Sequence, residues 1–296
     1  MKGIQETVKR ALAEDLGRRG DITTQLFVPR STKLRGRVVA KADGVICGTG
    51  VAREVFRQVE PGAKVRVLVP DGRPVRKGQA VLEVRGGRGI LTAERTALNF
   101  LQHLSGIATL TAAYARLVKG TRAKIHDTRK TIPGLRALAK YAVICGGGLN
   151  HRMGLHDAVL LKDNHWARGK ESLPTAGPCG DNAAGAWPAD LLRSAKEARR
   201  RYPGMMLEIE AADLPQVRMA VEAEPDVILL DNMTTATLKE AIRLIRAARP
   251  SPQVEISGGV SLATVRSLAK LGPDRISVGR ITHSAPALDL SLELEW

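Results

Sequence analysis

Short apolar runs alternate with amphipathic segments from residue 123 onward. Each run holds three to five nearly continuous apolar residues, which is typical of strands buried on both faces of a parallel sheet. The segments between them repeat apolar residues every three to four positions, as amphipathic helices do. The expected strands lie at residues 123–126, 158–161, 206–210, 227–230, 254–256 and 275–278. The expected helices lie at residues 135–144, 190–201, 214–223, 235–248 and 262–271.

The first hundred residues have a different texture and predict a mixed α+β unit. Asp71-Gly72 and Lys77-Gly78 have the composition of hairpin turns between short strands, and a glycine-rich stretch at 85–89 breaks the alternation. The elements expected here are a helix at 4–16, a turn or cap at 21–24, strands at 33–41, 64–69 and 80–84, and a helix at 94–119 interrupted near Gly106.

Each apolar run after residue 123 ends in polar residues or glycine. Glu210, Asp231, Ser257 and Gly279 recur at intervals close to the length of one βα unit. In a (β/α) barrel all strand ends of this kind meet at one rim, whereas an open doubly wound sheet gathers only a few of them at its switch point. The recurrence therefore favours the barrel. Neither a GxGxxG nor a GxxxxGK[ST] motif is present to suggest a Rossmann or P-loop site.

Composition narrows the class of protein. Hydrophobic residues make up 44% of the 296 residues, which is enough for a full core, and aromatics only 3%, so that core must be largely aliphatic. Cys47, Cys145 and Cys179 form no CxxC pair, and we expect reduced thiols in a cytoplasmic protein. No apolar run reaches the roughly 18 residues that a bilayer span needs, and the N-terminus lacks the apolar core of a signal peptide.

The formal net charge of +16 predicts attraction to anions, which include nucleic acids, acidic membranes and phosphorylated small molecules. The basic residues are scattered, and three Phe, three Tyr and three Trp offer no platform on which bases could stack. A membrane-surface role has only the helix at 4–16 to support it. We therefore expect neither a nucleic-acid nor a membrane partner.

The residues at the predicted rim suggest a site for several negative charges. Arginine forks suit carboxylates and phosphates, and glycine-rich turns late in a barrel suit a phosphate group. Two carboxylates among these cations make sense if they bind sugar hydroxyls or a partly hydrated Mg²⁺ ion. The pattern thus indicates a phosphosugar and a second, acidic substrate. The rim residues are Arg129, Lys130, Arg152 and Lys162, His126, His151 and His283, Glu210 and Asp231, and Ser257, Gly258, Gly259 and Gly279.

One segment, residues 166–188, interrupts the alternation. It is rich in Gly, Pro and Ala and has no periodicity, so a long insertion loop is expected between a strand and its helix. A passive insertion and an active-site lid are both compatible with its position beside the predicted rim.

Residues 126–165, HDTRKTIPGLRALAKYAVICGGGLNHRMGLHDAVLLKDNH, resemble the quinolinate phosphoribosyltransferase family. Further similar stretches follow in family order over nearly the whole chain: GDITT near the start, ERTALNFLQHLSGIAT, LEIE, ILLDN, EISGG and ISVGRITHSAP. The resemblance implies an incomplete (β/α) barrel with an N-terminal α/β sandwich domain that the C-terminus completes. The implied domains are residues 1–105, to which 281–296 return, and residues 106–280, which carry the insertion.

The resemblance also implies an activity and roles for individual residues. The reaction would convert quinolinate and phosphoribosyl pyrophosphate to nicotinate mononucleotide, pyrophosphate and carbon dioxide, with Mg²⁺. The implied assembly is a homodimer, and the sequence does not decide whether dimers assemble further into hexamers. By similarity the quinolinate-binding residues would be Arg129, His151, Arg152 and Lys162, with Arg95 from the neighbouring subunit. Those for phosphoribosyl pyrophosphate would be Lys130, Glu210, Asp231, Ser257, Gly258, Gly279 and His283. Lys130, Glu210 and Asp231 would act in catalysis, and Glu210 and Asp231 would hold the metal, directly or through water.

Three other interpretations stay open at this point. A paralogue associated with molybdenum transport shares the fold, but the intact DTRKT, NHR and KDN stretches favour the biosynthetic enzyme. Nicotinate phosphoribosyltransferase acts without decarboxylation, and the crowding of Arg and Lys suits a dicarboxylate better than its monocarboxylate. A non-enzymatic nucleic-acid-binding protein would explain the charge, but the chain lacks the expected aromatic platform.

Overall fold

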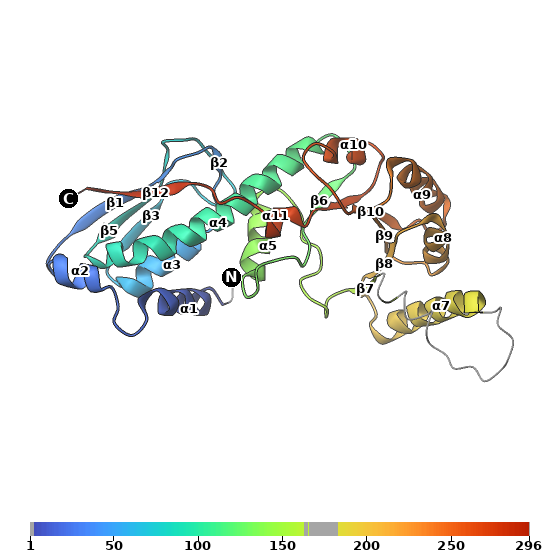
Figure 1. The fold of residues 1–296 in the computed structure, drawn as a ribbon, viewed down its shortest axis with the longest axis horizontal. Coiled ribbons are helices and arrows are strands. Elements are labelled where there is room, and N and C mark those ends of the chain that lie inside the picture. The colour runs from blue at the N-terminus through green and yellow to red at the C-terminus, as the bar shows by residue number, and fades with distance from the viewer. Residues whose placement is uncertain (1–2, 163–164, 166–182, 296) are drawn as a thin grey trace. The chain divides into compact units, whose positions relative to one another are not determined.

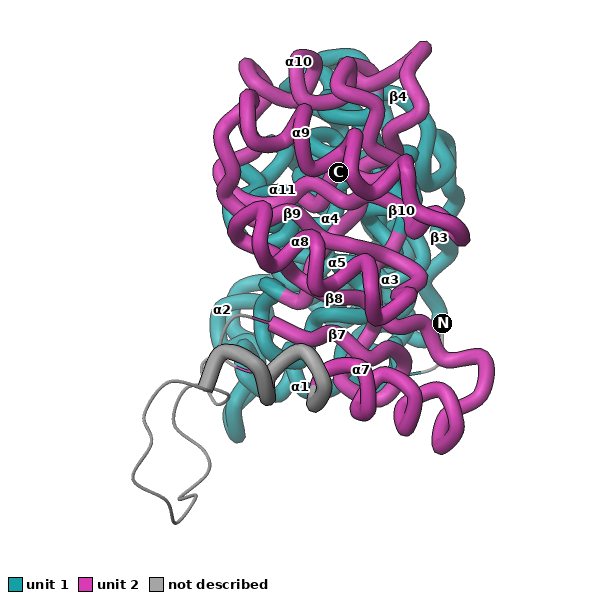
Figure 2. The backbone as a smooth tube through the Cα atoms, turned by 90° about the vertical axis from the view of Figure 1, so that its right-hand side faces the viewer, with its two compact units in different colours: residues 1–115, 130–149, 279–296 teal, residues 116–129, 150–278 magenta. Residues whose placement is uncertain are grey.

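The computed structural model describes residues 3–162, 165 and 183–295. These fall into two compact units (Figure 2). Unit 1 comprises residues 1–115, 130–149 and 279–296, and unit 2 comprises residues 116–129 and 150–278. The division differs from the predicted boundary at 105/106, because the helix at 89–117 runs across that boundary and residues 130–149 pack within unit 1.

Unit 1 is built on a four-stranded antiparallel sheet in the order β12-β1-β5-β3 (Figure 1). The strands are β1 (Leu34–Ala40), β3 (Lys64–Val67), β5 (Ala80–Gly86) and β12 (Leu290–Glu295). β12 pairs with β1 along its whole length, from Arg35 opposite Glu295 to Ala40 opposite Leu290. The prediction that the C-terminal segment completes the N-terminal sheet is thereby confirmed.

Helices and a small ribbon complete unit 1. Asp21 caps α2 by accepting a hydrogen bond from the Thr24 amide, as the sequence predicted for 21–24. The prediction missed α3, whose Val51, Ala52, Val55 and Phe56 are buried. The helices are α1 (Ile4–Leu16), α2 (Ile22–Phe27), α3 (Thr49–Val59), α4 (Gly89–Leu117), α5 (Arg136–Cys145) and α11 (Arg280–His283), and the ribbon joins β2 (Gly44–Val45) to β4 (Pro74–Val75).

The prediction that the long helix breaks near Gly106 was wrong. α4 is continuous from Gly89 to Leu117. Gly106 serves a packing purpose, because a Cβ atom there would lie 2.1 Å from the Pro286 carbonyl oxygen and 3.0 Å from the Ala287 Cα. A residue without a side chain lets the C-terminal segment of unit 1 lie against this turn of the helix.

Unit 2 is built on a six-stranded parallel sheet in the order β6-β11-β10-β9-β8-β7 (Figure 1). From β7 to β11 the order follows the chain without the reversal that marks an open doubly wound sheet. β6 then pairs with β11, and within the described residues β6 and β7 do not pair. This is a barrel left open between its first two strands, which confirms the predicted fold class. The strands are β6 (Lys124–His126), β7 (Val159–Leu161), β8 (Leu207–Ala211), β9 (Val227–Asp231), β10 (Gln253–Ser257) and β11 (Arg275–Ser277).

Among the described residues of unit 2, four helices connect these strands. α7 begins at Ala183, whereas the prediction placed its start at residue 190 and treated 183–188 as part of the insertion. The remainder of that insertion, residues 166–182, lies outside the described residues. The helices are α7 (Ala183–Arg201), α8 (Leu214–Glu222), α9 (Thr235–Ala247) and α10 (Val265–Ala269). Among the described residues, no helix is long and apolar enough to cross a membrane.

The parallel strands carry an unusual number of polar groups for a buried sheet. Every residue of β8 is buried, including Glu208 and Glu210, and Glu255 of β10 and Ser277 of β11 are buried as well. Polar side chains are rarely buried without partners, because an unpaired one costs the free energy of its lost hydration. These positions therefore point to the functional part of unit 2.

The close approach at Gly106 can be tested with a pair of helix glycines. Gly106→Ala should lower the free energy of unfolding by about 1–3 kcal/mol, because the new methyl group overlaps the Pro286 carbonyl. Gly50 in α3 has open space at its Cβ position, so Gly50→Ala should raise stability by up to about 1 kcal/mol. Urea unfolding of both variants measures the difference, and equal stabilisation by the two would contradict this account of Gly106.

Candidate active site

The carboxyl ends of neighbouring strands in unit 2 bring the predicted acids and the Ser-Gly turn together. Asp231 at the end of β9 lies in register with Ser257 at the end of β10. On the other side of β9, β8 places Glu210 opposite Leu229. The sequence predicted this convergence from the spacing of strand ends, and the parallel register accounts for it.

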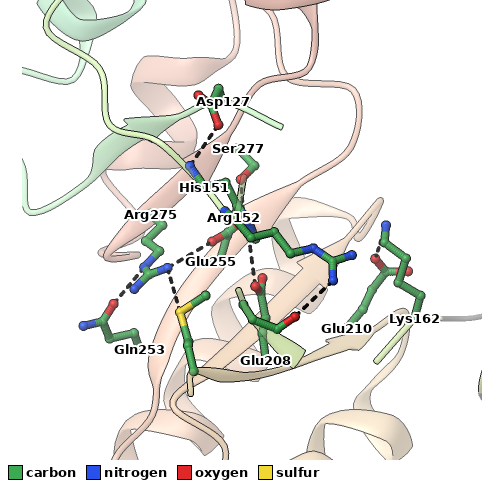
Figure 3. Close-up of polar contacts among 12 residues, drawn as sticks. Asp127, His151, Arg152, Lys162, Glu208, Glu210, Gln253, Glu255, Arg275 and Ser277 are labelled. Atoms are coloured by element: carbon green, nitrogen blue, oxygen red, sulfur yellow. Dashed lines mark hydrogen bonds and ion pairs between the residues drawn. The ribbon is translucent and has the colours of Figure 1, made fainter. Parts of the chain in front are cut away.

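Lys162 and Glu210 form an ion pair across two adjacent strands. Lys162 follows the end of β7, and its Nζ lies 3.3 Å from Oε2 of Glu210 on β8 (Figure 3). The Lys162 side chain is about half exposed at 46%, whereas that of Glu210 is 10% exposed. A buried carboxylate is thus joined to a cation that can still meet a ligand from solvent.

The turns after β9 and β10 contact each other through Asn232 and Gly258. Asn232 has a left-handed backbone with φ of 52°, and its Nδ2 donates a hydrogen bond of 2.8 Å to Asp231 Oδ2. Its amide donates to the Ser257 carbonyl at 3.1 Å. A Cβ at Gly258, where φ is 87°, would lie 2.2 Å from Asn232 Oδ1, so only glycine fits there. The pair of turns orients the Asp231 carboxylate.

Arg129 and Arg152 bring two guanidinium groups into the same part of unit 2. Burial and the nearby Arg129 both lower the pKa of Arg152. Arg152 NH1 donates to the Ala158 carbonyl at 3.3 Å, and Arg129 Nε is buried with no hydrogen-bond partner among the described residues. Two half-buried cations that repel each other, one with an unused donor, form a place suited to an anion with more than one carboxylate.

The ring of His151 is held by two buried glutamates (Figure 3). Its Nε2 lies 3.0 Å from Glu208 Oε2 and 3.5 Å from Glu255 Oε1, and neither glutamate side chain is exposed to solvent. Ser277 also donates its hydroxyl to Glu255. The backbone amide of His151 donates to Asp127 Oδ1 at 2.9 Å, and the amide of Arg152 donates to His151 Nδ1 at 2.8 Å. Both ring nitrogens therefore face protein groups, and Glu208, Glu255 and Asp127 together fix the segment that leads into Arg152.

The protons of this cluster are shared between the imidazole and the carboxylates. Burial alone lowers the pKa of His151, but the contacts with Glu208 and Glu255 outweigh it and raise that pKa to about 10. Burial and Glu255 raise the pKa of Glu208. Burial also favours protonation of Glu255, but hydrogen bonds from His151 and Ser277 prevail and lower its pKa. Because Nε2 faces both glutamates, it keeps its proton in either protonation state of the ring, and the ring keeps its orientation.

Sequence reasoning missed Glu208, Glu255 and Asp127. The signal was present, because Glu208 stands two residues before Glu210 in LEIE and Glu255 two before Ser257 in VEIS. Residues two apart on a strand point to the same face, so each missed glutamate lies one layer below a predicted site residue. The prediction attended only to the last residue of each strand.

Three predicted site residues lie together in unit 1. A Cβ at Gly279 would be 3.1 Å from the Lys130 Cδ and 3.3 Å from the His283 ring. Thr282 supports this arrangement by donating its hydroxyl to the Lys130 carbonyl at 2.7 Å. Arg95, which the sequence assigned to a neighbouring subunit's site, is exposed on α4.

Glu210 and Asp231 suit a magnesium ion better than a metal that needs a full set of protein ligands. They supply two carboxylates from adjacent strands, and one of them is buried. Mg²⁺ in proteins is commonly held by one or two carboxylates and takes its remaining oxygens from water and substrate phosphates. The residues present therefore fit that ion when a phosphorylated substrate accompanies it.

Comparison with known proteins covers both units. Residues 21–105 match the family model of the quinolinate phosphoribosyl transferase N-terminal domain, and residues 107–293 match that of the C-terminal domain. The nicotinate-nucleotide pyrophosphorylase (carboxylating) of Mycobacterium leprae is 43% identical over 293 residues, which cover 98% of this chain and 96% of that protein. A probable enzyme of the same name from Synechocystis is 38% identical, with 98% and 92% covered. The solved nicotinate-nucleotide pyrophosphorylase of Ehrlichia chaffeensis superposes with a TM-score of 0.86 at 34% identity, and each chain is covered completely.

The glutamates around His151 can be tested by titration. Glu208→Gln removes one of the two carboxylates that favour the protonated ring, so the pKa of His151 should fall from about 10 toward the ordinary value of 6.5. NMR of the histidine ring resonances measures it. Glu197→Gln, on the exposed surface of α7, serves as the control and should leave the His151 titration unchanged. An unchanged titration in Glu208→Gln would show that Glu208 does not control the ring.

Proposed function

This chain belongs to the quinolinate phosphoribosyltransferase family, and from that membership we propose how its residues divide the work of the reaction. The enzyme is a pentosyltransferase of NAD biosynthesis. It joins quinolinate to phosphoribosyl pyrophosphate, releases pyrophosphate and removes one carboxylate as carbon dioxide, which leaves nicotinate mononucleotide.

The observation that carries the assignment of the quinolinate site is the pair Arg129 and Arg152. Quinolinate has two adjacent carboxylates, and two neighbouring guanidinium groups with a buried, unused Nε donor match a dianion better than a monoanion. Lys162 adds a point charge whose present partner is Glu210. His151 contributes by fixing the segment that carries Arg152, since both of its ring nitrogens already contact protein groups.

Glu210 and Asp231 are proposed to bind the ribose hydroxyls and the magnesium ion of phosphoribosyl pyrophosphate. Their support is the register that places Asp231 beside Ser257 and the turn at Gly258 that orients its carboxylate. Mg²⁺ bound there, directly or through water, would neutralise charge on the departing pyrophosphate. Ser257 ends β10 and Gly258 follows it, and the two would offer a hydroxyl and a backbone amide to phosphate oxygens.

Lys130, Gly279 and His283 are proposed to bind phosphate groups of the same substrate. Their support is that unit 1 places all three side by side, with no side chain at Gly279 to obstruct an oxygen atom. Lys130 is exposed and carries the positive charge that a phosphate ligand needs. It would stabilise the charge that develops on the leaving pyrophosphate.

The chemistry needs positioning and charge rather than a covalent intermediate. As pyrophosphate leaves, positive charge develops on the ribose ring, and the Glu210 and Asp231 carboxylates stabilise it electrostatically. The quinolinate nitrogen then bonds to the ribose carbon. When the adjacent carboxylate departs as carbon dioxide, the positively charged pyridinium ring stabilises the electron pair left on the ring carbon, and that carbon then takes up a proton from water. The arginines hold that carboxylate in line with the ring until it leaves.

The alternatives left open by the sequence carry less support. The family models and the relatives point to the carboxylating pyrophosphorylase rather than to a transport-associated paralogue or a nucleic-acid-binding protein. We also propose that the enzyme works in the cytoplasm, and the free thiols of Cys47 and Cys145 support this placement.

The direct test is an assay with purified protein, quinolinate, phosphoribosyl pyrophosphate and Mg²⁺. We expect nicotinate mononucleotide and carbon dioxide in equal amounts, and loss of both when a chelator is added. Mononucleotide formed from nicotinate but not from quinolinate would contradict the proposed dicarboxylate site. Turnover that survives the chelator would contradict the role of the metal.

A matched pair of arginine variants locates the site in the same assay. Arg152→Ala should reduce kcat/KM for quinolinate by at least about 100-fold, because a charge-assisted contact to the substrate is lost. Arg218→Ala changes an exposed arginine on α8 and should have no effect. Circular dichroism should show the same fold for both variants. Normal turnover by Arg152→Ala would remove Arg152 from the site.

We propose further that two subunits share each active site through Arg95. Arg95 is exposed on α4 of its own subunit, as a residue that serves a neighbouring subunit must be. A symmetric dimer would then contain two sites, each with one Arg95 from across the interface.

Subunit mixing tests this arrangement. Arg95→Ala and Glu210→Gln should each be inactive alone, but a mixed dimer would contain one site in which both residues are intact. Random mixing should therefore restore about a quarter of wild-type activity per subunit, since half of the dimers are mixed and each holds one intact site. Mixtures that stay inactive, although mixed dimers are detected by mass spectrometry, would place Arg95 in its own subunit's site.

A further inference from the structure

Two cysteines distant in sequence meet in unit 1, and neither is among the residues assigned to substrate. The sulfur atoms of Cys47 and Cys145 and a carboxylate oxygen of Asp71 all lie within 4.8 Å of one another. The contact between the two thiols shifts the pKa of each of them. Cys47 follows the short strand β2, and Cys145 is the last residue of α5.

The backbone on the Cys47 side is held firmly. Two hydrogen bonds join the Cys47 backbone to Ser105 on α4. The Cys47 amide donates to Ser105 Oγ at 2.9 Å, and the Ser105 hydroxyl donates to the Cys47 carbonyl at 3.2 Å. The preceding residue, Ile46, is hydrogen bonded to the segment just before β4. Its amide donates to the Arg73 carbonyl, and its carbonyl accepts from the Gly72 amide. The position of Cys47 is therefore set by α4 and by the β2–β4 ribbon.

The Cys145 side is held just as closely. A Cβ at the next residue, Gly146, would lie 2.4 Å from the Ala108 carbonyl oxygen and 2.6 Å from the Thr111 Cβ, so the end of α5 lies directly against α4. A Cβ at Gly72 would lie 3.4 Å from the Cys145 carbonyl oxygen. Since both backbones are fixed by such contacts, the approach of the two sulfurs is part of the packing of unit 1.

The two thiols differ in the way that a reactive pair requires. Cys47 is fully buried, whereas Cys145 is partly exposed. The contact with Cys47 lowers the pKa of Cys145, whereas the same contact and burial raise the pKa of Cys47. Tyr141 donates its hydroxyl to Asp71 Oδ2 at 3.0 Å, which keeps that carboxylate engaged beside the sulfurs. The more acidic, more accessible thiol is thus the one that meets an oxidant first.

We propose that Cys47 and Cys145 form a reversible disulfide when hydrogen peroxide or an organic hydroperoxide oxidises the protein. The Cys145 sulfur attacks one peroxide oxygen, the O–O bond breaks, and Cys145 becomes a sulfenic acid. The leaving hydroxide, or the alkoxide of an organic hydroperoxide, takes up the thiol proton and departs as water or as an alcohol. The Cys47 sulfur then displaces the sulfenic oxygen, which leaves as water with the Cys47 proton. Two thiols lose two electrons in total, and the peroxide gains them.

The cross-link would tie α5 to the β2–α3 junction at a position that matters for the chain that follows. Cys145 is succeeded by Gly146–Gly148 and, three residues later, by His151 and Arg152. Oxidation would hold the start of this segment to the residues between β2 and α3, where Cys47 lies. The inference rests on the packing of unit 1 alone and does not depend on the proposed function.

The test uses the whole protein and the third cysteine as a control. After treatment with hydrogen peroxide, the intact mass of the wild type and of Cys179→Ser should fall by two hydrogen atoms, and dithiothreitol should restore it. A non-reduced tryptic digest should contain the peptide that joins Cys47 to Cys145. Neither Cys47→Ser nor Cys145→Ser should form that product. The melting temperature of the oxidised wild type should rise, because the cross-link closes a long loop in the unfolded chain.

Three outcomes would overturn the proposal. Peroxide could leave the wild-type mass unchanged, or it could add two oxygens to Cys145 without a cross-linked peptide. The cross-linked peptide could also contain Cys179 in place of either partner. Because these readings come from the wild type, they hold even if a serine variant fails to fold.

Discussion

The active-site part of this enzyme depends on the contact between the His151 ring and two glutamates whose side chains are fully buried. His151 Nε2 faces Glu208 and Glu255 inside the parallel sheet. Charges buried in this way repay their lost hydration only if the geometry is close to ideal, and removing one partner leaves another stranded. The cluster is therefore costly as a source of stability. What it supplies is position, because it joins β8, β10 and the segment before Arg152 at one point.

This constraint explains the layered construction of unit 2. Along β8 and β10 the buried glutamates form one layer, and Glu210 and Ser257 form the next layer toward the strand ends. The lower layer fixes the loop that delivers an arginine, and the upper layer meets the substrate. An aliphatic layer would pack as well in that place, but it would not hold the ring of His151 in one orientation. The shortage of aromatic residues in the chain fits the same design, since small aliphatic side chains leave room for these polar contacts.

The periodic elements could be predicted from the sequence because their apolar pattern is local. The strands of unit 2 and the helices α5, α8 and α9 follow the predicted ranges within a few residues. The errors arose where a distant segment decides the structure. Gly106 suggested a break in a helix, but the carbonyl of Pro286 explains the glycine. The convergence of Glu210, Asp231 and Ser257 was predictable from strand spacing, whereas Glu208 and Glu255 were missed because burial of a charge shows only when its partner's position is known.

The pairing of β1 with β12 has a consequence for how the protein is made. Residues 290–295 form one edge of the sheet whose other strands come from the first ninety residues. While a ribosome synthesises the chain, β1 therefore keeps one row of amides and carbonyls unpaired until residues 290–295 have emerged. Nascent chains that stall before this point display an open strand edge, which is the kind of surface that chaperones and proteases act on. The sheet of the first unit is thus closed on this side only by a segment that lies about two hundred residues beyond its other strands.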